Sequence, residues 1–159
     1  MIRSFVIALA AVVIVAAPAQ ASCWKTDQVA AAKIRDMETM LMVSALRCRG
    51  NGGTMIARYN QFVVKSRGAL LQVNDQLRTH FAENDGAGRA LGAYDSYVTK
   101  IANRYGAGAE GLTCDDLSAI TDAALSETPS FVALSALAER AGVQPLLGGG
   151  ECEARFAAR

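Results

Sequence analysis

The stretch AGRALGAYDSYVTKIANRYG, residues 87–106, carries the most regular apolar repeat in the chain. The repeat steps alternately by four and three positions, along Ala87, Leu91, Tyr94, Val98, Ile101 and Tyr105. This spacing is typical of the seam along which a helix packs in a coiled coil or a bundle. We therefore expect a helix over 87–105 that ends at Gly106, since glycine commonly terminates helices.

Helical patterns of the same kind lie on both sides of this stretch. They cover about 27–47 and 54–81, begin again at Thr113, and restart with Thr128 as the cap and Pro129 as the first helical residue, with glycine-rich turns between several of them. Gly68 interrupts the second pattern, where we expect it to let a neighbouring helix approach closely. Alternation with a period of two is nearly absent, which argues against a sheet. The sequence thus predicts an all-α, disulfide-stapled antiparallel bundle of four to five helices over 22–147, with a Gly-rich tail at 148–159.

The first 21 residues have the layout of a secretory signal peptide. Arg3 supplies a positive charge, residues 5–17 are apolar, and AQA at 19–21 provides the small residues of a cleavage site. The apolar run is shorter than the roughly 20 residues that span a bilayer. We therefore predict export to the periplasm or out of the cell. The alternative is a lipid anchor on Cys23, but Gln20 stands where lipoprotein signals usually carry Leu, and the AQA site cuts one residue too early.

The four cysteines all follow the predicted cleavage site, at Cys23, Cys48, Cys114 and Cys152. An even number in an exported protein indicates two disulfides, and the wide spacing argues against a zinc site. Cys23 and Cys48 flank the first predicted helix, whose rise of about 1.5 Å per residue separates them far beyond the roughly 7 Å that a disulfide bridges. An antiparallel bundle returns Cys114 to the end where Cys48 lies. The predicted pairs are therefore Cys48–Cys114 and Cys23–Cys152.

Charge excludes two classes of partner. The predicted leader contributes one of the 16 Lys and Arg residues, so its removal leaves them equal in number to the 15 Asp and Glu residues. A neutral chain is poorly suited to non-specific binding of nucleic acid or of an anionic membrane. Basic residues dominate up to Ala109 and acidic residues dominate from Glu110 onward. We expect the acidic part to fold back on the basic part; the alternative is a functional basic patch.

Residue types that support catalysis or metal binding are sparse. His80 is the single histidine, and we expect it on a solvated helix end near Glu83, without the partners that a triad or a metal site needs. Met37, Met40 and Met42 form a cluster of a kind that binds Cu(I), but their place on or beside an apolar helix stripe favours core packing. The sequence predicts no catalytic residue, no metal site and no cofactor.

A partner surface is predicted on the helix over 87–105. Tyr97, Lys100 and Arg104 are expected on its exposed side, and Tyr and Arg are enriched at protein interfaces. The predicted function is that of a non-enzymatic exported protein that binds a protein partner in the cell envelope. A periplasmic carrier of a small ligand or a metal is the alternative, and a hydrolase with an unrecognised site is the weaker third.

Three segments, CWKTDQVAAAKIRDMETMLMVSALRCR, YNQFVVKSRGALL and YDSYVTKIANRYG, resemble a group of small exported bacterial proteins of unknown function. The resemblance covers most of 23–114 and rests on pattern, without an active-site motif. It implies an exported helical fold with cysteines near these positions and implies no activity. In size and general shape the predicted domain is also similar to periplasmic immunity proteins and lysozyme inhibitors, a level of similarity that does not determine function.

Overall fold

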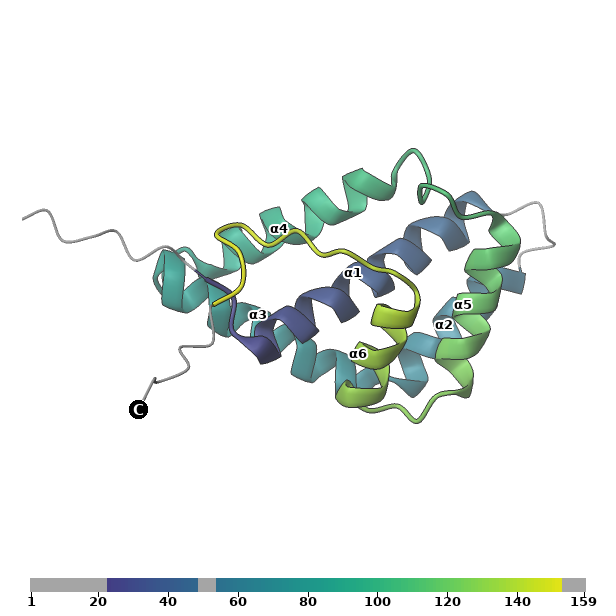
Figure 1. The fold of residues 1–159 in the computed structure, drawn as a ribbon, viewed down its shortest axis with the longest axis horizontal. Coiled ribbons are helices and arrows are strands. Elements are labelled where there is room, and N and C mark those ends of the chain that lie inside the picture. Colours follow the sequence, from purple (N-terminus) through teal and green to yellow (C-terminus); the bar gives the residue numbers. More distant parts are fainter. Residues whose placement is uncertain (1–22, 49–53, 153–159) are drawn as a thin grey trace, which may run out of the picture.

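Six helices build the part of the chain that the computed structural model describes, residues 23–48 and 54–152 (Figure 1). The predicted signal peptide and the last residues of the predicted tail lie outside these ranges. The helices are α1 (Thr26–Arg47), α2 (Thr54–Lys65), α3 (Arg67–Asp85), α4 (Ala90–Tyr105), α5 (Cys114–Ser126) and α6 (Phe131–Arg140). The all-α prediction is confirmed, with six helices in place of four to five. Within the described ranges the only β pairing is an isolated bridge between Trp24 and Glu151.

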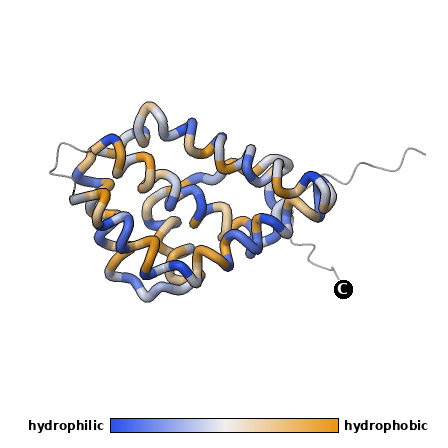
Figure 2. Tube along the Cα trace, turned by 180° about the vertical axis from the view of Figure 1, so that it is seen from behind, coloured by the Kyte–Doolittle hydropathy of each residue, from blue (hydrophilic) through white to orange (hydrophobic). Residues whose placement is uncertain are grey.

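The first helix lies at the centre of the fold. α1 contacts each of the other five helices, which surround it (Figure 1). Most of its residues are therefore buried, including Ala31, Ile34, Met37 and Leu41. Along all six helices apolar and polar residues follow one another in short blocks (Figure 2), as expected for helices that each bury one face. Because α1 is surrounded by other helices, little of its surface faces solvent, and it buries polar residues as well as apolar ones.

The pattern predicted as one helix over 54–81 forms two helices that meet at Ser66. The backbone N–H of Ser66 donates to Phe62 and the N–H of Leu70 donates to Ser66, so Ser66 takes part in the hydrogen bonding of both helices. The two halves nevertheless pack on different neighbours, α2 mainly on α5 and α3 mainly on α1 and α4. Ser and Gly are frequent at helix kinks, and Ser66 is followed closely by Gly68. The chain therefore turns a corner here (Figure 1).

The expectation that Gly68 lets another helix approach is wrong. A Cβ atom placed on Gly68 meets no atom within 4 Å. We therefore predict that Gly68→Ala raises the free energy of unfolding by about 0.5–1 kcal/mol, because alanine loses less conformational freedom in a helix. Chemical denaturation of the two proteins measures the difference. Gly142→Ala is the control: Gly142 has φ +69° after α6, and alanine there should be destabilising by about 1 kcal/mol. A destabilised Gly68→Ala variant would contradict the prediction.

The buried face of α4 differs from the predicted seam. The helix begins at Ala90, and Leu91 keeps 60% of its surface exposed. Its buried residues are Tyr97, Ile101 and Tyr105, while Tyr94 and Val98 are half-buried. The predicted seam is therefore correct near the end of the helix, at Ile101 and Tyr105. Earlier in the helix the most buried residue is Tyr97, which the predicted seam did not include. The sequence pattern does not fix the buried face more closely, because residues next to the predicted stripe on the helix surface are also apolar.

The disulfides join the predicted pairs. Cys23 is bonded to Cys152, with Cα atoms 4.8 Å apart, and Cys48 is bonded to Cys114, with Cα atoms 5.7 Å apart. The first bridge ties the segment after α6 to the segment before α1, where the Trp24 N–H donates to the Gly150 carbonyl and the Cys152 N–H donates to the Trp24 carbonyl. Intramolecular disulfides fit a protein that resides in an oxidising compartment.

The charge asymmetry is explained by packing within the chain. Lys33 of α1 pairs with Glu139 of α6 at 2.9 Å, and Arg58 of α2 pairs with Asp122 of α5 at 2.9 Å. The Lys65 ammonium donates to backbone carbonyls at the end of α5. The acidic part of the chain thus folds back on the basic part, as expected. The helix cap predicted at Thr113 is also present, since Thr113 and Asp116 exchange side-chain-to-backbone hydrogen bonds.

Candidate functional site

The three residues of the predicted partner surface lie in different environments. Tyr97 is only 7% exposed and packs its ring near Trp24 and Phe81, so its expected exposure is wrong. Its hydroxyl is buried and has no hydrogen-bond partner among the described residues. Lys100 is exposed, as expected. Arg104 is held by contacts inside the fold. Because only Lys100 stands free, these three residues do not form one face for a partner.

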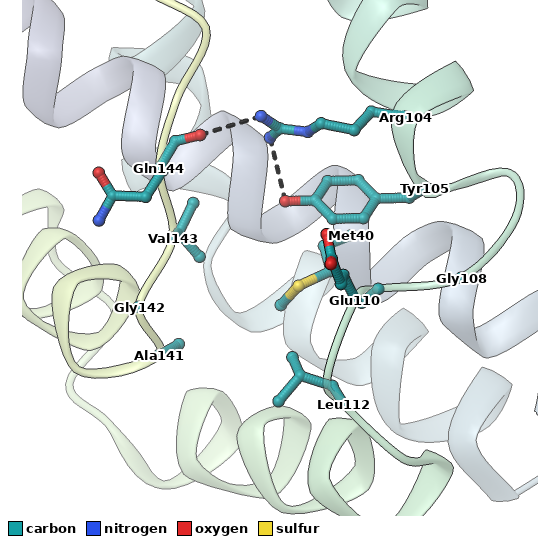
Figure 3. Close-up of a pocket in the computed structure, with 11 residues that line it drawn as sticks. Met40, Arg104, Tyr105, Gly108, Glu110, Leu112, Ala141, Gly142, Val143 and Gln144 are labelled. Carbon is teal, nitrogen blue, oxygen red and sulfur yellow. Dashed lines mark hydrogen bonds between the residues drawn. The ribbon is translucent and has the colours of Figure 1, made fainter.

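Arg104 joins the central helix to the segment after α6. Its guanidinium donates to the Tyr105 hydroxyl at 3.1 Å and to the Gln144 carbonyl at 2.9 Å (Figure 3). It also donates to Asp36 of α1. The Tyr105 hydroxyl also donates to Asp36, whose side chain is fully buried. Burial raises the pKa of the Asp36 carboxyl, and the hydrogen bonds from Tyr105 and Arg104 oppose that effect. A buried carboxylate needs such donors, so Arg104 has a structural role here.

A second polar cluster lies along the same helix. Arg35 pairs with Glu38 at 2.7 Å and also donates to Asn74 of α3, while the Tyr59 hydroxyl of α2 donates to Glu38. Burial raises the pKa of the Tyr59 hydroxyl, and the nearby Glu38 carboxylate raises it further. Sequence reasoning missed these residues, although the charged run beside Ile34 and Met37 was a visible signal. They connect α1 to α2 and α3.

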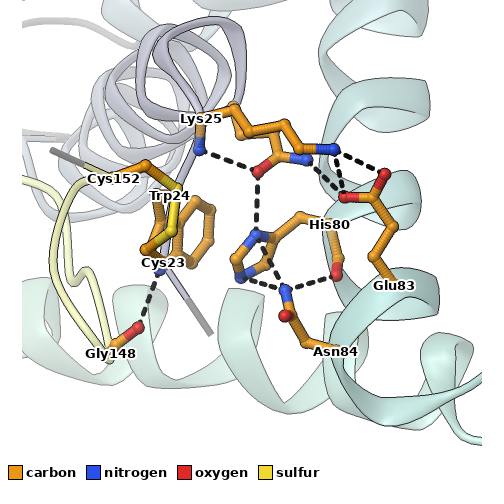
Figure 4. Close-up of a disulfide and its surroundings, with 9 residues drawn as sticks. Cys23, Trp24, Lys25, His80, Glu83, Asn84, Gly148 and Cys152 are labelled. Atoms are coloured by element: carbon orange, nitrogen blue, oxygen red, sulfur yellow. Dashed lines mark hydrogen bonds and ion pairs between the residues drawn. A yellow bond between two sulfur atoms is a disulfide. The ribbon is translucent and has the colours of Figure 1, made fainter. Parts of the chain in front are cut away.

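The most structured site in the molecule surrounds Trp24, the single tryptophan of the chain. Its indole is 2% exposed and stacks on His80, with ring centroids 3.6 Å apart. Phe81 meets it edge-on at 5.9 Å, and the indole N–H donates to the Gly148 carbonyl at 3.0 Å (Figure 4). The neighbouring Cys23–Cys152 disulfide holds the two chain segments together. The indole is therefore held by a stacked ring, by an edge-on ring and by a hydrogen bond at its polar edge.

His80 is buried, which corrects the expectation of a solvated helix end. Its Nδ1 lies 3.0 Å from the Gln28 side-chain oxygen, and the Asn84 amide donates to its backbone carbonyl at 2.8 Å (Figure 4). Gln28 in turn donates to Glu83, which also pairs with Lys25 at 2.7 Å. Burial lowers the pKa of the His80 imidazole, against the opposite effect of nearby Glu83 and Asp85. Its partners are amides, so the arrangement orients a neutral ring and supplies no nucleophile.

We predict that stability falls on acidification because of His80. The folded protein holds His80 neutral with a lowered pKa, whereas the unfolded chain protonates it near its usual value of about 6.5. Unfolding therefore takes up a proton below that pH, and the free energy of unfolding decreases as pH falls from about 6.5 toward the lowered value. Urea unfolding between neutral and mildly acidic pH measures the slope. In His80→Gln the slope over this window should shrink; an unchanged slope would contradict the assignment.

A cavity of about 480 Å³ opens beside Trp24. Its lining comes from four separate parts of the chain: the segment before α1, the end of α3, α4 and the segment after α6. The residues are Trp24, His80, Phe81, Asn84, Asp85, Ala93, Ser96, Tyr97, Lys100, Leu146 and Gly148. This volume lies within the range of roughly 300–1,000 Å³ that small-molecule sites occupy. Two residues of the predicted partner surface, Tyr97 and Lys100, thus line this cavity, and the third, Arg104, does not.

A second cavity, of about 390 Å³, lies beside Arg104 and Tyr105 and extends to Met40 and Gly142 (Figure 3). The hydrogen-bond donors of Arg104 that face it are already used within the fold. Met37 and Met40 are buried in the core, in agreement with the core packing predicted for them. Within residues 23–48 and 54–152, no group of His, Cys, Asp and Glu is arranged to hold a metal ion.

The corner between α2 and α3 exposes two apolar side chains. Val64 keeps 77% and Leu71 53% of their surface exposed. A groove of about 210 Å³ runs along this corner. Leu71 and Arg67 line it together with the buried Arg35–Glu38 pair. In the described part of the chain, Arg67 forms no ion pair. The corner therefore combines apolar area, a shallow groove and an available guanidinium.

No protein family, curated protein or solved structure matches the chain. The small helical fold and the four cysteines agree with the resemblance to small exported bacterial proteins of unknown function. That resemblance implies no activity. In the described part of the chain, no helix combines the length and the apolar content required to cross a membrane.

Proposed function

We propose that this protein is a non-enzymatic exported binding protein, and that it binds a protein partner of the cell envelope through the corner between α2 and α3. The observation that carries the proposal is the exposure of Val64 and Leu71 on either side of Ser66. Burying such a side chain contributes about 1.5–3 kcal/mol. Leu71 lines the groove, and Val64 directly follows its lining residue Val63, so both add exposed apolar area to the corner.

Charge at the corner favours a partner with an acidic group. Arg67 lies between the two apolar residues along the chain and is exposed. Arginine is enriched at interface hot spots and pairs well with carboxylates. We therefore expect a partner segment that presents an apolar side chain and a carboxylate to this corner.

The proposal is tested by crosslinking the tagged, oxidised protein in an envelope extract and identifying the captured partner. Val64→Asp and Leu71→Asp should each reduce capture of the same partner at least tenfold, because a buried carboxylate opposes an apolar contact. Val132→Asp is the matched control, since Val132 is as exposed as Val64 but lies on α6. Equal capture by all three variants would overturn the proposed surface. Dimerisation of the purified protein that Leu71→Asp abolishes would replace the partner by a second copy.

A small-ligand carrier is the second candidate function, and one observation favours it. The cavity beside Trp24 has the volume of a small-molecule site and joins aromatic walls to charged rim residues. It shares no lining residue with the groove at the α2–α3 corner. The two candidates can therefore be tested separately in the same protein.

A further inference from the structure

We infer that the cavity beside Trp24 binds a small zwitterion with an apolar body, of the class of a free amino acid with a large apolar side chain. The cavity presents an apolar aromatic wall together with one basic and one acidic side chain, Lys100 and Asp85. An apolar body would lie against the wall, a carboxylate would meet Lys100, and an ammonium group would meet Asp85. The inference does not depend on the partner surface at the α2–α3 corner.

The aromatic wall is rigid before any ligand arrives. Tyr97 lies 5.5 Å from both Trp24 and Phe81 by ring centroids, and all three residues are buried. Trp24 is held by its stack on His80 and by its hydrogen bond to Gly148, whose segment the disulfide ties down. A preorganised wall does not lose further conformational freedom when a ligand binds, which favours affinity.

The two charged rim residues are available to a ligand. Neither Lys100 nor Asp85 forms an ion pair with another residue in 23–48 or 54–152. The nearby Lys25 and Glu83 already pair with one another, and His80 is buried against amide partners. A simple organic anion would be attracted by Lys100 but repelled by Asp85. A simple cation would be attracted by Asp85 but repelled by Lys100. A zwitterion satisfies both rim charges, because opposite charges attract and like charges repel.

The test uses three probes that share a phenyl ring and differ in charge: phenylalanine, phenylpropionate and phenylethylamine. Trp24 is the single tryptophan and lines the cavity, so its fluorescence reports binding at this site and calorimetry gives the affinity. On the full oxidised protein we expect phenylalanine to bind about tenfold more tightly than either singly charged probe, since each of those probes lacks one of the two charge-assisted hydrogen bonds.

Variants assign each charge to its partner. Lys100→Gln should remove the advantage of phenylalanine over phenylethylamine, and Asp85→Asn should remove its advantage over phenylpropionate. Arg89→Gln and Asp95→Asn are matched controls, because both residues are exposed on or beside α4 and do not line the cavity. Ser96→Phe, at an exposed lining position, should block all three probes. Absence of saturable binding, equal affinity for the three probes, or unchanged preference in both charge variants would each overturn the inference.

Discussion

Replacing Cys23 and Cys152 together by serine should lower the free energy of unfolding by about 4–5 kcal/mol. This bridge joins residues 129 positions apart, and in the chain-entropy model the stabilisation grows with the length of the closed loop, reaching about 4.7 kcal/mol for 100 residues. The variant also frees the segment whose Gly148 carbonyl accepts from the Trp24 indole. Urea denaturation followed by circular dichroism measures the loss.

The matched comparison is the double serine variant of Cys48 and Cys114, which are 66 positions apart. Its loss should be slightly smaller, at about 4 kcal/mol by the same model. The two variants should also differ locally. Removal of the Cys23–Cys152 bridge should raise the solvent exposure of Trp24 and shift its fluorescence to longer wavelength, whereas removal of the other bridge should leave Trp24 unchanged in the folded state. A loss below about 1 kcal/mol for the first variant would show that the bridge does not stabilise the fold.

Trp24→Ala should cost about 3–5 kcal/mol, the range for removing a buried aromatic side chain. The indole is in contact with His80, Phe81 and Tyr97 and also donates a hydrogen bond, so its removal leaves a cavity and an unpaired carbonyl at Gly148. Chemical denaturation followed by circular dichroism measures the change.

Trp24→Phe is the control for this prediction. It keeps most of the apolar contact and loses only the indole hydrogen bond, so we expect a cost of about 1–2 kcal/mol. Because Trp24 and Cys23 act on the same segment, their effects should not add: the combined loss should fall short of the sum of the two. Full additivity would mean that the indole and the disulfide stabilise independent parts of the fold.

The sequence predicted the features that depend on chain direction and helix periodicity. The disulfide pairs followed from antiparallel helices and from the length of the first helix, and the Thr113 cap followed from local residue types. The bend at Ser66 did not follow, because the apolar stripe keeps a period of 3.6 on both sides of the kink. Tyr97 and His80 were misplaced for a related reason. Both side chains combine an apolar ring with a polar atom, and only tertiary packing decides whether such a ring is buried.

The polar residues of α1 illustrate the same limit. Arg35, Asp36 and Glu38 look like the solvated side of an amphipathic helix, and a helix covered on one side would expose them. Their burial follows from the central place of α1, which is a property of the whole fold. Each then needs a partner from another helix, and those partners, Asn74, Tyr59, Arg104 and Tyr105, come from three different elements.

The position of α1 between Cys23 and Cys48 bears on the order in which the bridges form. In a chain made from its N-terminus these two thiols appear first, and each has its partner much later in the sequence. Once its 22 residues are helical, α1 holds the two early thiols about 33 Å apart. The helix therefore acts as a spacer that keeps the first two cysteines from oxidising with one another until Cys114 and then Cys152 have been made. Helix-breaking substitutions in α1 should accordingly increase the yield of the non-native Cys23–Cys48 bridge on refolding, which non-reducing peptide mapping would detect.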